Sequence, residues 1–291
     1  MKLDLDWKEK SIKMSNFFDV HGYCYPSKGM RVFSGIVEST TKVSPNNYYK
    51  ISAEVSGLDS IWERLSKHEK SALVIDNKSF RDNLNALKAS IESDESYSNL
   101  FNGVAVPFLI TPESNLQKNI GLVFEDKILQ ALGNVFEDNH PELNFKSVIQ
   151  GGEHLSEKIK AFPNTGQDRL IEIASVKPVV GFYFPEVFKE YDIDSQRRQF
   201  AELPHRENLA LSGLLDIAAA LRGSPNLLIN EDGYPPILCA SGNAHIDERL
   251  IFLFKSYGHH LEFWAMSQML TPEIKQVSEQ FFGGLSFYKA I

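Results

Sequence analysis

Apolar residues recur along this chain at intervals of three and four, which is the period of one face of an amphipathic α-helix. Phe80, Leu84, Leu87 and Ile91 show this spacing most regularly, with polar residues between them. The same period predicts three further helices, at 58–65, 116–135 and 209–221. A last helix is predicted to begin at Thr271-Pro-Glu273 and to close at Gly283-Gly284.

Other stretches alternate between apolar and polar residues or are short apolar runs, and these predict β-strands. Tyr49, Ile51, Ala53 and Val55 alternate with polar residues, as a half-buried strand requires. Further strands are predicted at 31–37, 72–75, 104–110, 169–174, 179–184, 227–229, 237–240, 250–254 and 285–291. We expect 169–174 and 179–184 to pair as antiparallel neighbours, because they are close in sequence.

Turn and cap residues refine these limits. The pair Ser114 and Gln117, behind Thr111-Pro112, has capping-box spacing and predicts that the helix at 116–135 starts there. Glu231-Asp-Gly233 lies between two predicted strands and is typical of a β-hairpin turn.

The mixture of elements predicts an α+β fold: a mixed, largely antiparallel sheet with several hairpins, packed by amphipathic helices. Two domain organisations fit the chain. In the first, residues 1–100 form an N-terminal subdomain of a β-hairpin and helices, and residues 101–291 form the main mixed-sheet domain. In the second, residues 1–291 form one domain. The length of 291 residues allows either.

Composition narrows the class of protein. Hydrophobic residues make up 43% and charged residues 23%, as in ordinary globular chains, and the net charge of −8 argues against nucleic-acid binding by bulk charge. Two cysteines, no visible signal peptide and no run of about 18–20 apolar residues favour a cytoplasmic location without a membrane span. Oligomeric state is left open.

Cys239, His245 and Asp247 form the first candidate site, because a cysteine nucleophile needs a base and a group that orients the base. The same pattern also fits a buried strand cysteine followed by a surface turn. His21 and Cys24 form a second candidate, a binding-site rim rich in aromatic residues, and Trp264 is a further candidate binding residue.

His245, His259 and Glu262 lie close together in sequence and have side chains that bind zinc or iron. Their spacing matches no known metal motif, so the alternative is a set of histidines at a loop and helix edge. The sequence requires no cofactor.

These candidates predict a Cys/His-dependent hydrolase or transferase acting on a small molecule or peptide. One alternative is a non-enzymatic binding or host-interaction protein with a small-molecule or protein partner, and another is a metalloenzyme. An exposed apolar patch in the folded chain, rather than a polar pocket, favours the binding protein.

Overall fold

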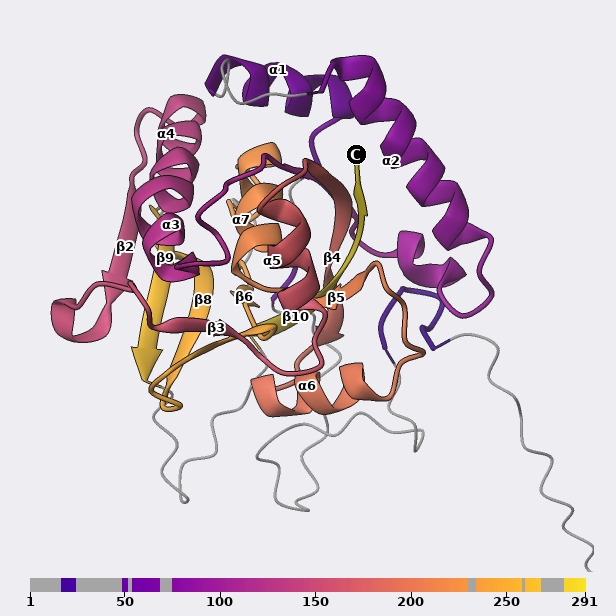
Figure 1. Ribbon diagram of the computed structural model, residues 1–291. Helices are drawn as coiled ribbons and strands as arrows, with labels where there is room; N and C mark the ends of the chain where they lie inside the picture. The colour runs from indigo at the N-terminus through magenta and orange to yellow at the C-terminus, as the bar shows by residue number, and fades with distance from the viewer. Residues whose placement is uncertain are drawn as a thin grey trace, which may run out of the picture.

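The computed structural model describes residues 17–24, 49–51, 54–68, 75–229, 234–257, 260–267 and 280–291. Its centre is an eight-stranded mixed sheet (Figure 1). The spatial order is β1 (Val106–Ile110), β4 (Val179–Lys189), β10 (Phe281–Ala290), β6 (Ile237–Cys239), β8 (Leu250–Tyr257), β9 (His260–Ser267) and β2 (Phe145–Ile149), with β5 (Leu209–Leu211) also on β10.

The pairing is antiparallel except between β10 and β6 and between β9 and β2. The predicted mixed, largely antiparallel sheet is therefore confirmed. A separate ribbon pairs β3 (Ile159–Ala161) with β7 (Asn243–His245).

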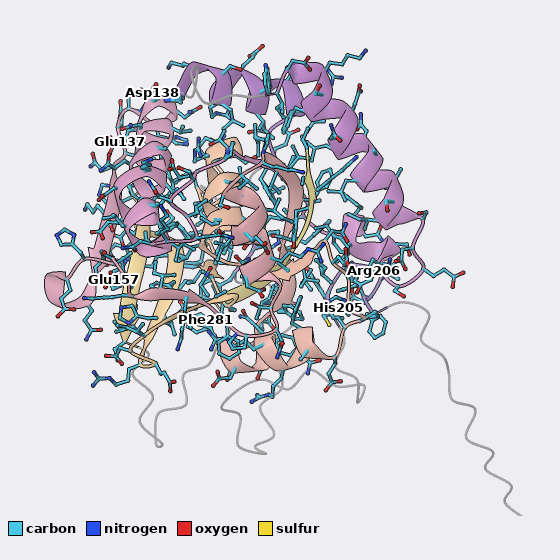
Figure 2. All side chains as sticks on the ribbon, viewed as in Figure 1. Glu137, Asp138, Glu157, His205, Arg206 and Phe281 are labelled. Carbon is cyan, nitrogen blue, oxygen red and sulfur yellow. The ribbon has the colours of Figure 1, made fainter. Side chains whose placement is uncertain are left out.

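Helices pack on both faces of the sheet. The first face is covered by α5 (Gln167–Ala174), α7 (Leu214–Gly223) and the continuous run α3 (Ile120–Val123), η2 (Phe124–Leu129) and α4 (Gln130–Asn139). The second face meets α1 (Leu58–His68), α2 (Asn77–Glu92) and the short η1 (Ser98–Asn102), and further along it α6 (Ile193–Ala201). The single turn η3 (Gln150–Gly152) follows β2. Charged side chains such as Glu137, Asp138 and Arg206 lie at the periphery (Figure 2).

The helix α2 has the limits and buried face that the apolar period predicts. Asp76 caps it, since its side chain accepts a hydrogen bond from the Ser79 backbone N–H at 2.6 Å. Its buried residues are Phe80, Leu84, Leu87 and Ile91. The predicted helix at 58–65 is likewise confirmed as α1.

The predicted strand at 169–174 is wrong, because this segment forms α5. Leu170, Ile171 and Ala174 are buried at spacings that one helix face shares with a short alternating run. Gly166, with φ of +75°, lets the chain enter the helix in a conformation that favours glycine. The predicted pairing of 169–174 with 179–184 is therefore absent, and β4 lies between β1 and β10.

Three predicted helix boundaries also shift. The helix predicted from residue 116 begins at Ile120, where Asn119 rather than Ser114 provides the cap. The apolar run 209–221 divides into β5 and α7. Gly283 and Gly284 lie inside β10 instead of ending a helix.

The remaining predicted strands, turn and helix start either have another structure or lie outside the described residues. The segment 227–229 is a turn rather than a strand, and Tyr49 forms an isolated bridge with Tyr234. The predicted strand at 31–37, most of 72–75, the turn at 231–233 and the helix start at 271–273 lie outside the described residues.

One core cluster contains residues from both sides of residue 100, the boundary in one of the two predicted domain organisations. Leu84 and Ile91 of α2 share this cluster with Phe182 of β4 and Phe287 of β10. In the described part of the chain, no helix has both the length and the apolar character needed to cross a membrane.

Candidate functional site

The second face of the sheet changes character along its width. Over β1, β4 and β10 its apolar side chains pack against α2 and η1. Over β6, β8 and β9 the corresponding side chains are Ile237, Ile251, Leu253, Trp264 and Met266. Of the described helices, only α6 contributes to this second cluster, through Ile193. We call this region the open half of the sheet.

The strand register sets the open half out in rows. Cys239 pairs with Leu253, Leu253 with Trp264, and Trp264 with Val148, so one apolar row crosses four strands. In β8, the side chains of Leu253 and its neighbour Phe252 point to opposite faces of the sheet, as pleating requires. Phe252 belongs to the core beneath α3 and α4, whereas Leu253 lies on the open half.

A parallel row on the same face is charged. Lys255 of β8 pairs with Glu262 of β9, and Glu262 pairs with Lys146 of β2. Direct cross-strand neighbours of opposite charge attract each other, so this row places one carboxylate between two ammonium groups.

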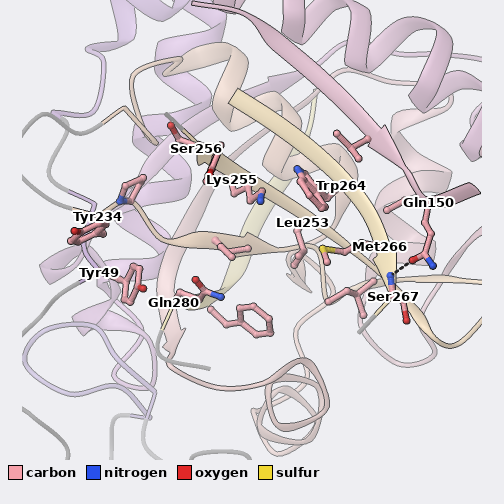
Figure 3. Close-up of a pocket in the computed structure, with 17 residues that line it drawn as sticks. Tyr49, Gln150, Tyr234, Leu253, Lys255, Ser256, Trp264, Met266, Ser267 and Gln280 are labelled. Carbon is pink, nitrogen blue, oxygen red and sulfur yellow. Dashed lines mark hydrogen bonds between the residues drawn. The ribbon is translucent and has the colours of Figure 1, made fainter. Parts of the chain in front are cut away.

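The open half forms a cavity of about 710 Å³ (Figure 3). Tyr49 and Tyr234 stand at one end, with ring centroids 6.2 Å apart. Gln150 and Ser267 stand at the other end, where the Ser267 backbone N–H donates to Gln150 Oε1 at 2.6 Å. Small-molecule sites commonly occupy about 300–1,000 Å³ and are mostly apolar with a few polar groups.

Lys255 and Trp264 meet in the middle of the cavity (Figure 3). Lys255 Nζ lies 3.8 Å from the centroid of the Trp264 ring, which is a close cation–π contact. Trp264 Nε1 donates a hydrogen bond to Glu262 Oε2 at 2.7 Å. This bond fixes the indole ring, and the ring in turn supports the lysine.

Two exposed tyrosines border the cavity. Tyr234 is 58% exposed and Tyr257 is 70% exposed, and both line it. Large exposed aromatic side chains grouped around a hollow are typical of binding sites, whereas single ones need no explanation.

Cys239 is fully buried beneath the open half, in contact with the cluster that contains Ile193, Leu253 and Phe281. Burial raises the pKa of its thiol to about 12. A thiol with such a pKa stays protonated at neutral pH and is a poor nucleophile.

His245 lies on the opposite side of the sheet from Cys239. Its ring packs 5.9 Å from that of Phe252, which faces the core under α3 and α4. Its Nδ1 accepts a hydrogen bond from the Asp247 backbone N–H at 2.9 Å, and burial lowers its pKa. The Asp247 carboxylate binds Arg249 at 2.9 and 2.7 Å, which holds the pKa of Asp247 at about 2. The structure therefore does not bring Cys239 to His245.

The second group of candidates is also dispersed. His21 is exposed in a turn where its backbone N–H donates to Asp19. Cys24 is 2% exposed in the core beneath α2. Trp264 alone among these three lines the cavity.

The structure describes two of the three metal candidates, and it does not bring these two together. Glu262 faces the open half, while His245 faces the opposite core. His259 lies outside the described residues. Among the residues that the structure does describe, no three His, Cys, Asp or Glu side chains are placed to share a metal ion.

A separate polar cluster is enclosed in the core. The Asp216 carboxylate accepts hydrogen bonds from the Gly213 backbone N–H, the Gln167 amide and the Ser286 hydroxyl. It is completely buried, and desolvation raises its pKa. The Gly213 bond caps the start of α7, and the Gln167 and Ser286 bonds join α5 and β10 to that helix, so the cluster links three elements of the fold.

Sequence reasoning named Glu262 only as a candidate metal ligand and missed Lys255 and the pairing of these two charges in one site. The signal was present in two alternating stretches, 250–257 and 260–267, which place Ile251, Leu253 and Lys255 on one face. What the alternation does not show is that α6 is the only described helix that reaches that face, through Ile193. Comparison of this chain with protein-family models, with curated proteins and with solved structures finds no match.

Proposed function

We propose that this protein is a non-enzymatic binding protein and that it holds a small, largely apolar molecule in the cavity of the open half. The observation that carries the proposal is the row Leu253, Trp264 and Val148, with Ile251 and Met266 beside it, facing a hollow of about 710 Å³. Burying such a surface on a ligand is favourable by about 25 cal/mol per Å² of apolar area removed from water.

The chemistry of the lining supports binding rather than bond cleavage. Trp264 and Leu253 supply apolar surface, and the amides of Gln150 and Gln280 supply polar groups at the edge. A Cys/His hydrolase stays a prediction, and two observations weigh against it: the raised pKa of Cys239 and the position of His245 across the sheet.

The test uses N-phenyl-1-naphthylamine, a neutral probe whose fluorescence rises in apolar surroundings. We expect saturable binding to one site per chain. In Ile251→Glu, a carboxylate enters the apolar wall, and we expect affinity to fall at least tenfold.

The matched control is Val176→Glu, which adds the same charge at a residue that is 71% exposed and outside the cavity. We expect this variant to bind like the wild type. Circular dichroism spectra verify that both variants are folded. Probe binding that is absent in the wild type, or equally weakened in both variants, would contradict the proposal.

A further inference from the structure

We infer that the cavity selects an acidic ligand, an apolar body carrying one carboxylate or similar anionic group, and that Lys255 binds this group. The inference rests on the proposed binding function and adds the chemical class of the ligand. It starts from the charges of the lining. Of the described residues that line the cavity, Lys255 alone carries a formal charge, although the chain as a whole has a net charge of −8.

The Lys255 ammonium retains its hydrogen-bonding capacity. Among the described residues, its nearest carboxylate oxygen is Glu262 Oε2 at 3.8 Å, which makes an ion pair but lies beyond hydrogen-bond distance. Its other close contacts are aromatic: the Trp264 ring at 3.8 Å and the Tyr257 ring at 5.4 Å. Neither ring accepts a conventional hydrogen bond, so three N–H donors stand at the cavity without a carboxylate or carbonyl acceptor among the described residues.

The carboxylate of Glu262 does not remove the ability of Lys255 to bind an anionic group. Its side chain is 9% exposed against 20% for Lys255, so the ammonium is the more accessible partner. Glu262 Oε2 already accepts the indole N–H of Trp264 at 2.7 Å. Lys146 flanks Glu262 on the next strand, which gives the charged row a net positive charge.

The apolar rows beside Lys255 indicate the chemical character of the remainder of the ligand. Leu253 lies in the row next to Lys255, and Ile251 and Met266 form the row beyond it. An acid group placed at Lys255 thus leaves its apolar body against these side chains. A charge-assisted hydrogen bond is about twice as strong as a neutral one, and it gains further where apolar walls exclude water. A neutral molecule of the same shape lacks that contribution.

The experiment compares two ligands that have the same eight-carbon chain. Octanoate and 1-octanol each displace N-phenyl-1-naphthylamine from the wild type, from Lys255→Met and from Lys177→Met. Methionine retains the length of the lysine stem and removes the charge. Lys177 is an exposed lysine after α5, outside the cavity, so its variant controls for the loss of one positive charge.

We expect octanoate to bind the wild type at least as tightly as octanol, although the alcohol is the more apolar molecule. In Lys255→Met, we expect octanoate to weaken about tenfold while octanol changes less than twofold. Lys177→Met should match the wild type for both ligands.

Two results overturn the inference. One is weaker binding of octanoate than of octanol by the wild type, and this comparison decides the question even if Lys255→Met fails to fold. The other is an equal effect of Lys255→Met and Lys177→Met on octanoate. If the wild type fails to bind the naphthylamine probe itself, the proposed function fails; if it binds the probe but binds octanoate more weakly than octanol, only this inference fails.

Discussion

The two halves of the second sheet face have the same alternation of apolar side chains along their strands, but they differ in how these side chains are covered. In the covered half, Leu109, Phe182, Phe184 and Phe287 pack beneath α2 and η1 and are at most 6% exposed. In the open half, the equivalent positions include Trp264, which remains partly exposed. A similar apolar pattern therefore becomes core where α2 and η1 pack over it and lines a cavity where, among the described helices, only α6 reaches it.

The two halves also differ in the types of side chain that they carry. The sheet residues Leu109, Phe182, Phe184 and Phe287 of the covered half are aliphatic or phenylalanine side chains with no polar end. The open half adds Lys255, Glu262 and Trp264, which combine an apolar body with a polar group. Such side chains suit a surface that meets water in one state and a ligand in another.

The largest expected effect is in the covered half. Leu84→Ala removes a fully buried side chain from α2, and we expect the free energy of unfolding to fall by about 2–5 kcal/mol, as large-to-small core changes do. Urea denaturation followed by circular dichroism measures this loss. A cost below about 1 kcal/mol would mean that α2 is not a firm cover, because such small costs are typical of surface positions.

Tyr97 is the second test, because it is 1% exposed in the covered half and its hydroxyl donates to the Pro204 carbonyl at 2.8 Å. Tyr97→Phe should lower the free energy of unfolding at pH 7 by about 1 kcal/mol, the usual contribution of such a hydrogen bond.

Burial also raises the pKa of the Tyr97 phenol above its ordinary value near 10. Because the folded-state pKa is the higher one, the stabilisation is complete below pH about 10 and is lost as the pH rises through the folded-state value. We expect Tyr97→Phe to show a shallower loss of stability between pH about 9 and 11 than the wild type. Parallel slopes for the two proteins would contradict the burial of this hydroxyl.

Met266→Ala is the counterpart of Leu84→Ala, since methionine and leucine have similar volumes. Met266 is partly exposed on the open half, so we expect a loss below about 1 kcal/mol in the same urea experiment. A loss equal to that of Leu84→Ala would show that the open half is as well covered as the other half, and it would break the comparison.

The smallest expected effect concerns the thiol of Cys239, which we expect not to react in the folded protein. Cys239 has no exposed surface, and burial raises its pKa to about 12, so Ellman's reagent at pH 8 should not modify it in a Cys24→Ser background. The same variant in urea should react fully, which verifies the assay. Rapid reaction of the folded protein would instead support the Cys/His hydrolase prediction.

The sequence predicts an element well where its pattern fits only one kind of structure. Phe80 to Ile91 keeps the helical period over several turns, and the apolar run predicted at 104–110 contains the buried strand Val106–Ile110. The six residues 169–174 satisfy both periods, so the pattern alone does not decide, and packing against the sheet selects a helix. Trp264 is a predicted binding residue and Lys255 is not, because the significance of Lys255 depends on the Trp264 ring, whose centroid lies 3.8 Å from its Nζ on the neighbouring strand.

The order of strands in the sheet has a consequence for folding. β6, β8 and β9 lie next to one another and are also close in sequence, whereas β1 pairs with β4, β4 with β10, and β2 with β9 across long stretches of chain. Closing a long loop costs more entropy than closing a short one, and contacts between distant residues slow folding. Pairing β6, β8 and β9, the strands that carry Cys239, Leu253, Lys255 and Trp264, therefore costs the least loop entropy, whereas the covered half and the β2 edge both depend on contacts that close long loops.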